Sequence, residues 1–183
     1  MREQEFGPRR SKETVKPGVM CQEIVFYYCK HCKNLFQLFG AGEGKILTCC
    51  GEKMQLLDAK SPSEVSECVL IDYKITGGYN ENAVEVFWKI KKRNVSIKWI
   101  YIKTFTGGQI KYVTNPQKTS FIFALADEDA YAYCDEDPCL ECVFQCKRGF
   151  EIYAYMGAGV LIKVPLEKCM PIGSPDPIAF SPF

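Results

Sequence analysis

The sequence predicts a mainly β protein that combines a small metal-binding unit, an antiparallel β-sandwich and a cysteine-rich C-terminal extension. Three observations predict this fold class. Apolar and polar residues alternate over several short stretches, as strands with one buried face require. Glycine pairs separate some of these stretches at positions typical of hairpin turns. No stretch has the length and the capping residues of a helix.

The small unit is expected over residues 21–57, after a flexible N-terminal arm over residues 1–20. An apolar strand, Ile24 to Tyr28, leads into the turn CKHC, and the segments LFQLF, GAGEG, ILT, CCGEKM and QLL follow. A unit of this size is too small for a real core and normally needs a metal ion or a disulfide for its stability. The segment DAKSPSE, residues 58–64, is the expected linker.

The β-sandwich is expected over residues 65–137. Two alternating series mark its strands: Val84, Val86, Trp88 and Ile90, and then Val95, Ile97, Trp99 and Tyr101. Gly77-Gly78 and Gly107-Gly108 are the expected hairpin turns, and FIFALA and AYAYC supply two further short strands. Residues 138–183 are expected to hold a cysteine-rich loop, a hairpin (FEIYAY, GAG, VLIKV) and a proline-rich tail.

Composition narrows the function classes. The chain has 183 residues, is 47% hydrophobic and has a net charge of +1, and its mean hydropathy is −0.12. Such a charge gives no attraction to nucleic acid or to a membrane surface. No apolar run approaches the ~20 residues of a membrane span, and the first twenty residues lack the apolar core of a secretory signal. We therefore expect a soluble cytoplasmic protein.

The eleven cysteines are informative in such a compartment. Disulfides are rare in a reducing environment, so clustered cysteines there more often bind metal or carry redox chemistry. Three cysteines stand apart and suit the role of small buried hydrophobes better: Cys21, Cys68 and Cys169. The other eight form two clusters: Cys29, Cys32, Cys49 and Cys50, and then Cys134, Cys139, Cys142 and Cys146.

The first cluster has the pattern of a metal site. Two cysteine pairs brought together by a hairpin offer four thiolates in a tetrahedron, which suits zinc or a single iron. Metal binding would also fold the small unit. Spacing alone leaves the choice of metal open. His31, the only histidine, is expected to be a solvated residue of the turn, because four thiolates already complete the site.

The segment FYYCKHCKNLFQLFGAGEGKILTCCGEKMQLL resembles the desulforedoxin domain that opens the desulfoferrodoxins. The matching residues are Cys29, Cys32, Cys49, Cys50, Gly51, Met54, Leu56 and Leu57. Lys33 departs from the family pattern, which often has glycine there. The resemblance covers about thirty residues, and it implies one iron held by four thiolates, with zinc as the alternative, and a homodimer.

The resemblance continues more weakly through residues 65–134, and there it implies an immunoglobulin-like sandwich of the superoxide reductase type. That family holds an open iron with four histidines and one cysteine. Here the histidine positions fall on Cys68, on Lys89 and Val95, and on Asp137. Four imidazoles cannot come from a single histidine, so we reject the standard superoxide reductase mechanism for this chain.

The second cluster, Cys134-x4-Cys139-x2-Cys142-x3-Cys146, lies on a short loop that could wrap a [4Fe–4S] cluster. A second mononuclear site for zinc or iron and uncoordinated thiols are the alternatives. If the sandwich keeps the family geometry, Cys68 would lie near Cys134 and could replace one of the four ligands.

These features favour one-electron transfer over catalysis, with a redox partner protein and two cysteine-ligated iron centres. A divergent reductase of superoxide or another oxidant, acting at the second centre, is the enzymatic alternative. A zinc-bound structural subunit is the third hypothesis.

Overall fold

The computed structural model describes residues 23–40, 46–76, 82–130, 147 and 149–166, and every structural statement below concerns these residues. Its strands are β1 (Ile24–Tyr28), β2 (Leu35–Phe39), β3 (Thr48–Cys49), β4 (Glu52–Lys53), β5 (Gln55–Leu56), β6 (Val69–Thr76), β7 (Ala83–Ile90), β8 (Trp99–Lys103), β9 (Gly108–Tyr112), β10 (Ser120–Ala124), β11 (Glu151–Gly157) and β12 (Val160–Pro165). The described helices are two short 3-10 turns, η1 (Ser63–Val65) and η3 (Asp127–Ala130). None of the helices in the described ranges has the length and the apolar character that crossing a membrane requires. The predicted mainly β class is confirmed.

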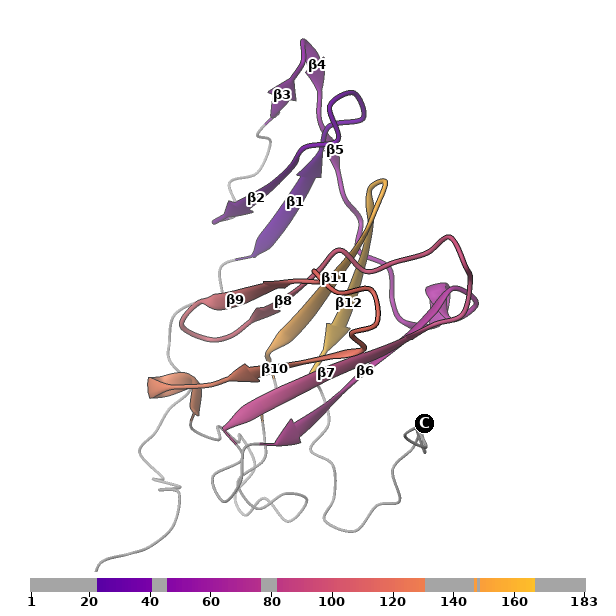
Figure 1. Cartoon of the computed structure of the whole chain (residues 1–183). Coiled ribbons are helices and arrows are strands. Elements are labelled where there is room, and N and C mark those ends of the chain that lie inside the picture. The colour runs from indigo at the N-terminus through magenta and orange to yellow at the C-terminus, as the bar shows by residue number, and fades with distance from the viewer. Residues whose placement is uncertain (1–22, 41–45, 77–81, 131–146, 148, 167–183) are drawn as a thin grey trace, which may run out of the picture.

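Three sheets lie in three layers (Figure 1). The bottom layer has the order β10-β7-β6, the middle layer β12-β11-β8-β9 and the top layer β2-β1-β5, with a two-stranded β3-β4 hairpin above it. All strand pairs within these sheets are antiparallel. The two lower layers form the expected sandwich.

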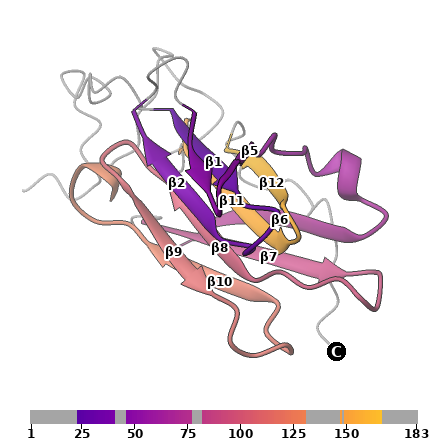
Figure 2. The same cartoon turned by 90° about the horizontal axis from the view of Figure 1, so that it is seen from above.

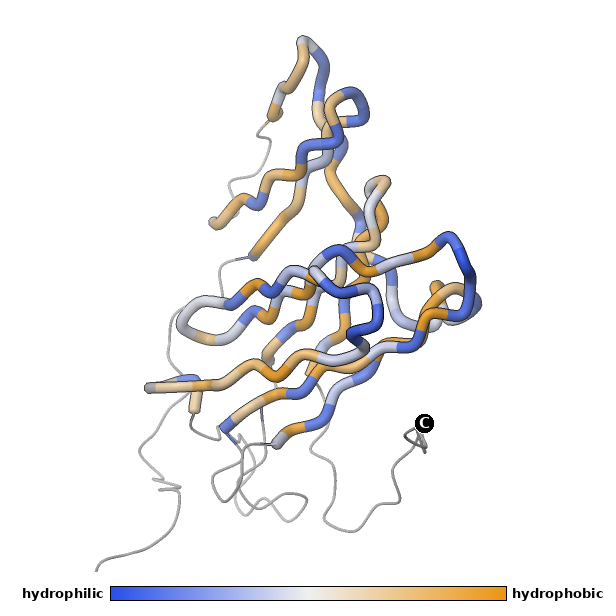
Figure 3. The backbone as a smooth tube through the Cα atoms, viewed as in Figure 1, coloured by the Kyte–Doolittle hydropathy of each residue, from blue (hydrophilic) through white to orange (hydrophobic). Residues whose placement is uncertain are grey.

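The alternation of residues 84–90 is confirmed in β7, which buries Val84, Val86 and Trp88. These side chains meet the inward residues of the middle sheet in one core. Its fully buried members include Phe123, Ile100, Ile102, Ile152 and Ile162. The loop that follows β7 is hydrophilic, in contrast to the apolar strands around it (Figure 3).

The hairpin of β11 and β12 belongs to the sandwich. The sequence predicts it in the C-terminal extension, whereas β11 pairs with β8 from Glu151↔Lys103 to Tyr155↔Trp99, and these two strands form the centre of the four-stranded sheet. This long-range pairing brings together strands about fifty residues apart. Sequence periodicity cannot reveal it, because periodicity reports a buried face and not the strand beside it.

The small N-terminal unit packs on the outer face of the middle sheet. Figure 2, seen from above, shows β1 and β2 lying over β8 and β11. A second cluster of buried side chains fills this interface: Phe26, Tyr28 and Leu57 from the small unit, and Trp99, Tyr101, Tyr153, Tyr155 and Leu161 from the sandwich. The small unit therefore shares a core with the sandwich.

This second cover explains a difference at β8. The alternation predicts Ile97, Trp99 and Tyr101 on one face, but all five residues of β8 are buried. Ile100 and Ile102 face the sandwich core with Ile97, whereas Trp99 and Tyr101 face the small unit. A strand covered on both faces loses the alternation of a half-buried strand.

The expected linker is attached to the sandwich. Lys60 forms a parallel bridge with Ile162, in which its N–H donates to the Leu161 carbonyl at 2.9 Å and its carbonyl accepts from the Lys163 N–H at 2.9 Å. These bonds add Lys60 as a single paired residue at the outer edge of β12, and they tie the linker after the small unit to the sandwich.

Several expectations lie outside the described residues. They are the arm over residues 1–20, most of the GAGEG turn, the Gly77-Gly78 turn, most of the AYAYC segment, the second cysteine cluster and the proline-rich tail. The hairpin turn at Gly107-Gly108 is confirmed, since β8 and β9 pair as far as Lys103 opposite Gly108 and the Thr104 N–H donates to the Gly107 carbonyl.

Candidate metal centre

The first cysteine pair lies in a tight turn at the end of β1. The N–H of Lys33 donates to the Cys29 carbonyl at 3.0 Å, and the N–H of Cys29 donates to the Asn34 carbonyl at 2.9 Å. These two bonds close the loop and direct Cys29 and Cys32 towards the same point. Lys33 completes the turn with a φ of +65°, a left-handed conformation that favours glycine. A glycine, which the resemblance predicts at this position, would adopt this conformation without strain.

The second pair forms a β-hairpin turn. Thr48 pairs with Lys53 and Cys49 with Glu52, which leaves Cys50 and Gly51 as a two-residue loop. Their φ values are +53° and +79°, as in a type I′ turn, which needs positive φ at both central residues. Cys49 is therefore the last residue of a strand and Cys50 the first residue of the turn. This geometry explains why two adjacent cysteines can share one site.

β5 joins the two pairs, because it runs antiparallel to β1 with Tyr28 opposite Gln55. Cys29 follows Tyr28, and Met54 precedes Gln55, so both turns lie at the same end of the β1-β5 pair. The N–H of Met54 donates to the Leu47 carbonyl at 2.8 Å, which closes the base of the β3-β4 hairpin. The predicted site residues Cys29, Cys32, Cys49 and Cys50 are brought together.

The sulfur atoms have the separation that a tetrahedral metal site requires. All four Sγ atoms lie within 4.8 Å of one another. Cys49 Sγ is 3.5 Å from Cys32 Sγ and 3.9 Å from Cys50 Sγ. Four thiolates at about 2.3 Å from a central ion would be about 3.8 Å apart. A disulfide needs about 2.05 Å, and the four cysteines are free thiols.

The four thiols differ in acidity. A hydrogen bond from the backbone of Cys32 lowers the pKa of Cys29 to about 7, although desolvation acts in the opposite direction. The thiol of Cys32 raises the pKa of Cys49 to about 12, and burial adds to the rise. The same neighbour raises the pKa of Cys50. Crowded thiolates repel one another, so a bound cation would be needed to ionise all four, and protons would be released as it binds. The donor set fits a thiophilic metal ion.

One edge of the centre is open to solvent. Cys29 is buried, whereas Cys50 and Gly51 are exposed at the tip of the hairpin. His31 is also exposed, as expected for a solvated residue of the turn.

Cys68 lies apart from the described residues that flank the second cluster. It immediately precedes β6, and its carbonyl accepts from the Lys91 N–H at 2.9 Å. The second cluster itself, Cys134, Cys139, Cys142 and Cys146, lies outside the described residues. Its described neighbours, Ala130 and Lys147, are joined by a hydrogen bond of 2.9 Å from Lys147 Nζ to the Ala130 carbonyl.

The positions of Cys68 and Ala130 follow from strand register. Ala130 follows β10, whose last residue Ala124 pairs with Ala83, and Ala83 pairs with Thr76 at the far end of β6. The eight residues of β6 span about 26 Å. Cys68 and Ala130 accordingly lie at opposite ends of the sandwich, as Figures 1 and 2 both show for η1 and η3.

Sequence reasoning missed the aromatic surroundings of the centre. Tyr28 directly precedes Cys29, is buried, and packs against Gly159, whose Cβ position would lie 3.2 Å from the Tyr28 ring. Trp99 and Tyr155 lie beyond it in the same cluster. The one available signal was the alternation of aromatic residues in the segment FEIYAY, which indicates a buried face but not what packs against that face.

Comparison with known proteins supports the fold. The chain is similar to the crystal structure of the superoxide reductase from Treponema pallidum, with a TM-score of 0.50 and 15% sequence identity. The match covers 78% of this chain and 98% of that chain. No protein-family model matches the sequence, and no curated protein sequence does. At this identity the likeness shows a shared superoxide-reductase-type fold, and the site must be judged on its own residues.

Proposed function

We propose that this protein is an iron-binding electron-transfer protein in which Cys29, Cys32, Cys49 and Cys50 hold one iron in a rubredoxin-type centre. The observation that carries the proposal is the convergence of four free thiols within 4.8 Å, on two turns that the backbone itself preorganises. The proposed role is electron carriage rather than catalysis.

The donor set favours electron exchange over substrate binding. Four thiolates fill a tetrahedral site and leave no open position. A bound iron would supply one-electron redox chemistry. The protein would supply four fixed ligands, a buried side at Cys29 and an exposed edge at Cys50, where a redox partner protein can approach. A cytoplasmic location and a homodimer belong to the same proposal.

A second, cysteine-ligated iron–sulfur centre, formed by Cys134, Cys139, Cys142 and Cys146, is part of the proposal. The bond from Lys147 Nζ to the Ala130 carbonyl supports it, because this bond holds the two ends of the segment that carries the four cysteines close together. A segment closed at its base loses little further entropy when its thiols converge on one cluster. We leave Cys68 out of this centre because of its place at the other end of the sandwich.

The shared fold favours one alternative, a divergent oxidoreductase that acts on superoxide or another oxidant. The single histidine of the chain cannot provide the four imidazoles of the standard site. Titration with azide or cyanide separates the two functions. A fully cysteine-ligated protein gives no ligand-induced change in its visible spectrum, whereas an iron with an open position does.

The direct test is anaerobic purification of the full chain, followed by iron, zinc and acid-labile sulfide analysis with EPR. One iron per chain without sulfide would support the first centre and contradict the [4Fe–4S] cluster, whereas about five irons and about four sulfides would support both. A colourless, zinc-containing protein would overturn the redox function and favour a structural subunit.

Matched cysteine variants assign the ligands. Cys49→Ser should lose the iron–thiolate absorption of the first centre, because one ligand of its tetrahedron is removed. Cys68→Ser is the control, since Cys68 lies outside that centre, and it should retain the full absorption. Loss of absorption in Cys68→Ser, or its retention in Cys49→Ser, would contradict the ligand assignment.

A further inference from the structure

A path of aromatic side chains, joined at one point through the backbone of Gly159, begins next to the metal centre. Tyr28 is covalently next to the ligand Cys29, and its side chain is buried in the interface between the small unit and the sandwich. Its ring contacts Gly159, and the N–H of Gly159 lies 3.4 Å from the Tyr155 hydroxyl. Gly159 thus allows the first aromatic ring of the small unit to approach the sandwich closely.

The path continues across the outer face of the middle sheet. Tyr155 stacks on Trp99, with ring centroids 5.2 Å apart and planes inclined by 21°. Phe26 lies 5.8 Å from Trp99 and 5.3 Å from Tyr153, again between centroids. These separations are those of aromatic rings in direct contact. No saturated gap interrupts the series from Tyr155 to Tyr153.

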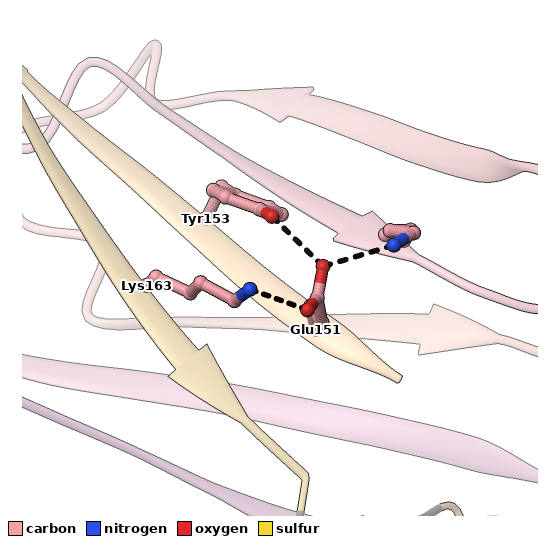
Figure 4. Close-up of polar contacts among 4 residues, drawn as sticks. Glu151, Tyr153 and Lys163 are labelled. Carbon is pink, nitrogen blue, oxygen red and sulfur yellow. Dashed lines mark hydrogen bonds and ion pairs between the residues drawn. The ribbon is translucent and has the colours of Figure 1, made fainter. Parts of the chain in front are cut away.

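The path ends in a charged group at the far edge of the interface. The hydroxyl of Tyr153 donates to Glu151 at 2.8 Å, and the same carboxylate accepts from Lys103 at 3.1 Å and from Lys163. Figure 4 shows Tyr153 and Lys163 converging on Glu151.

Glu151 follows Phe150, whose ring centroid lies 4.9 Å from that of Phe105, and the Phe105 N–H donates to Asp129 in η3. This is the end of the sandwich where Ala130 and Lys147 lie.

Burial raises the pKa of Tyr153, Tyr155 and Tyr101, so these phenols stay neutral at physiological pH. The π-orbitals of closely packed, neutral rings can mediate electron tunnelling across the interface. The sandwich core contains a comparable aromatic contact, between Trp88 and Phe121 at 5.4 Å. That contact has no connection to a cysteine of the centre.

We infer that the aromatic interface of Tyr28, Tyr155, Trp99, Phe26 and Tyr153 is the intramolecular electron route between the four-cysteine centre and the Glu151 end of the sandwich. The inference rests on the proposed iron centre. An iron held by the four cysteines would supply one electron, and a one-electron oxidant at the Glu151 end, namely the oxidised metal centre of a redox partner protein, would accept it. The side chains serve as the bridge and are neither oxidised nor deprotonated, and no bond forms or breaks.

The test supplies its own acceptor at that end. Pro165 is exposed and pairs with Glu151 across β11 and β12, so Pro165→His offers an attachment point for a photo-oxidisable ruthenium–polypyridine complex. His31 is the only natural histidine, and His31→Gln in the same chain restricts the label to one place. A laser flash with an external quencher generates Ru(III), and the appearance of the Fe(III)–thiolate absorption gives the rate of electron transfer from Fe(II).

Trp99→Leu and Tyr155→Leu, each placed in this labelled chain, should slow the transfer severalfold relative to the labelled parent chain, because each opens a saturated gap in the stack. Trp99→Phe should restore most of the rate, because it returns an aromatic ring to the gap. Phe121→Leu is the matched control, since it removes a buried ring of the sandwich core away from the route. It should leave the rate unchanged at a comparable loss of stability.

Two outcomes would overturn the route. Equal rates in all variants would place the transfer in the backbone, through the bridge between Lys60 and Ile162. Equal slowing in all variants, Phe121→Leu included, would indicate a general loosening of the protein. Failure of the proposed function looks different, because the labelled parent chain would then show no reversible iron–thiolate absorption before any flash.

Discussion

Lys33 has a left-handed backbone with a φ of +65° directly after the first cysteine pair. That conformation costs a non-glycine residue roughly 1–2 kcal/mol. Glycine avoids this cost, but it also raises the conformational entropy of the unfolded chain, which cancels part of the gain in stability. Lys33→Gly should therefore raise the free energy of unfolding of the metal-loaded protein by about 0.5–1 kcal/mol. Guanidinium denaturation measures this change.

The control for this substitution is Lys30→Gly, at an exposed position of the same turn that does not have a positive φ. There glycine only adds unfolded-state entropy, so stability should fall slightly. A fall in both variants would show that the side chain of Lys33, which donates to the Lys30 carbonyl, matters more than its backbone.

Glu151 gives the interface an acid-sensitive group. Burial alone would raise its pKa, but hydrogen bonds from Lys163, Tyr153 and Lys103 outweigh burial, and the pKa is lowered. A carboxyl whose folded pKa lies below its unfolded value stabilises the protein above the unfolded pKa of about 4.3, and this contribution is lost as pH falls through the folded pKa.

Glu151→Gln should consequently cost about 2–3 kcal/mol at pH 7, because Lys103, only 10% exposed, loses its anionic partner. The difference between wild type and variant should shrink below about pH 4. Urea denaturation between pH 7 and 3.5 measures it. Glu85→Gln, which breaks the more exposed pair with Lys74, is the control and should change stability by less than about 1 kcal/mol. A pH-independent difference for Glu151→Gln would exclude the acid-sensitive role.

At the scale of the elements, the β8–β9 hairpin depends on Gly108, the first residue of β9. A Cβ on Gly108 would lie 2.1 Å from the Tyr101 hydroxyl and 2.6 Å from the Ile102 carbonyl oxygen, whereas one on Gly107 would meet nothing within 4 Å. Gly108→Ala should destabilise the protein by about 1–3 kcal/mol, because backbone or ring must shift. Gly107→Ala should be close to neutral. Thermal unfolding of the pair tests this, and equal melting temperatures would contradict it.

The sequence predicted individual strands and turns better than it predicted which strands lie side by side. The strand at Ile24–Tyr28, the alternation in β7 and the Gly107-Gly108 turn are local features, and the structure has all three. The four cysteines of the first centre also followed from spacing, since each pair lies within one turn. Each of these predictions rests on residues close together in the chain.

Three features of the fold could not be read in this way. The pairing of β11 with β8, the double cover of β8 and the bridge at Lys60 join residues that are distant in sequence. Alternation reports whether a face is buried but not what buries it. The alternation predicts Trp99 and Tyr101 on the same face as Ile97, whereas they belong to the interface with the small unit.

At the scale of the whole molecule, the small unit and the sandwich should unfold together. They share the aromatic cluster around Phe26, which is 3% exposed. Phe26→Ala should lower the free energy of unfolding by about 3–5 kcal/mol, with metal release and loss of strand circular dichroism shifting to the same denaturant concentration. Phe36→Ala, 47% exposed on β2, should cost less than about 1 kcal/mol. Two separate transitions would mean that the units fold independently.

The shared cluster has a consequence for any attempt to dissect the chain. A fragment that begins at residue 65 would leave Trp99, Tyr101, Tyr153 and Tyr155 facing water on one flat sheet surface. Such a surface promotes self-association, and we expect the fragment to precipitate or to form soluble aggregates in gel filtration. Expression of the chain as two fragments, divided at the linker of residues 58–64, would therefore yield two aggregation-prone pieces of one cooperatively folded protein.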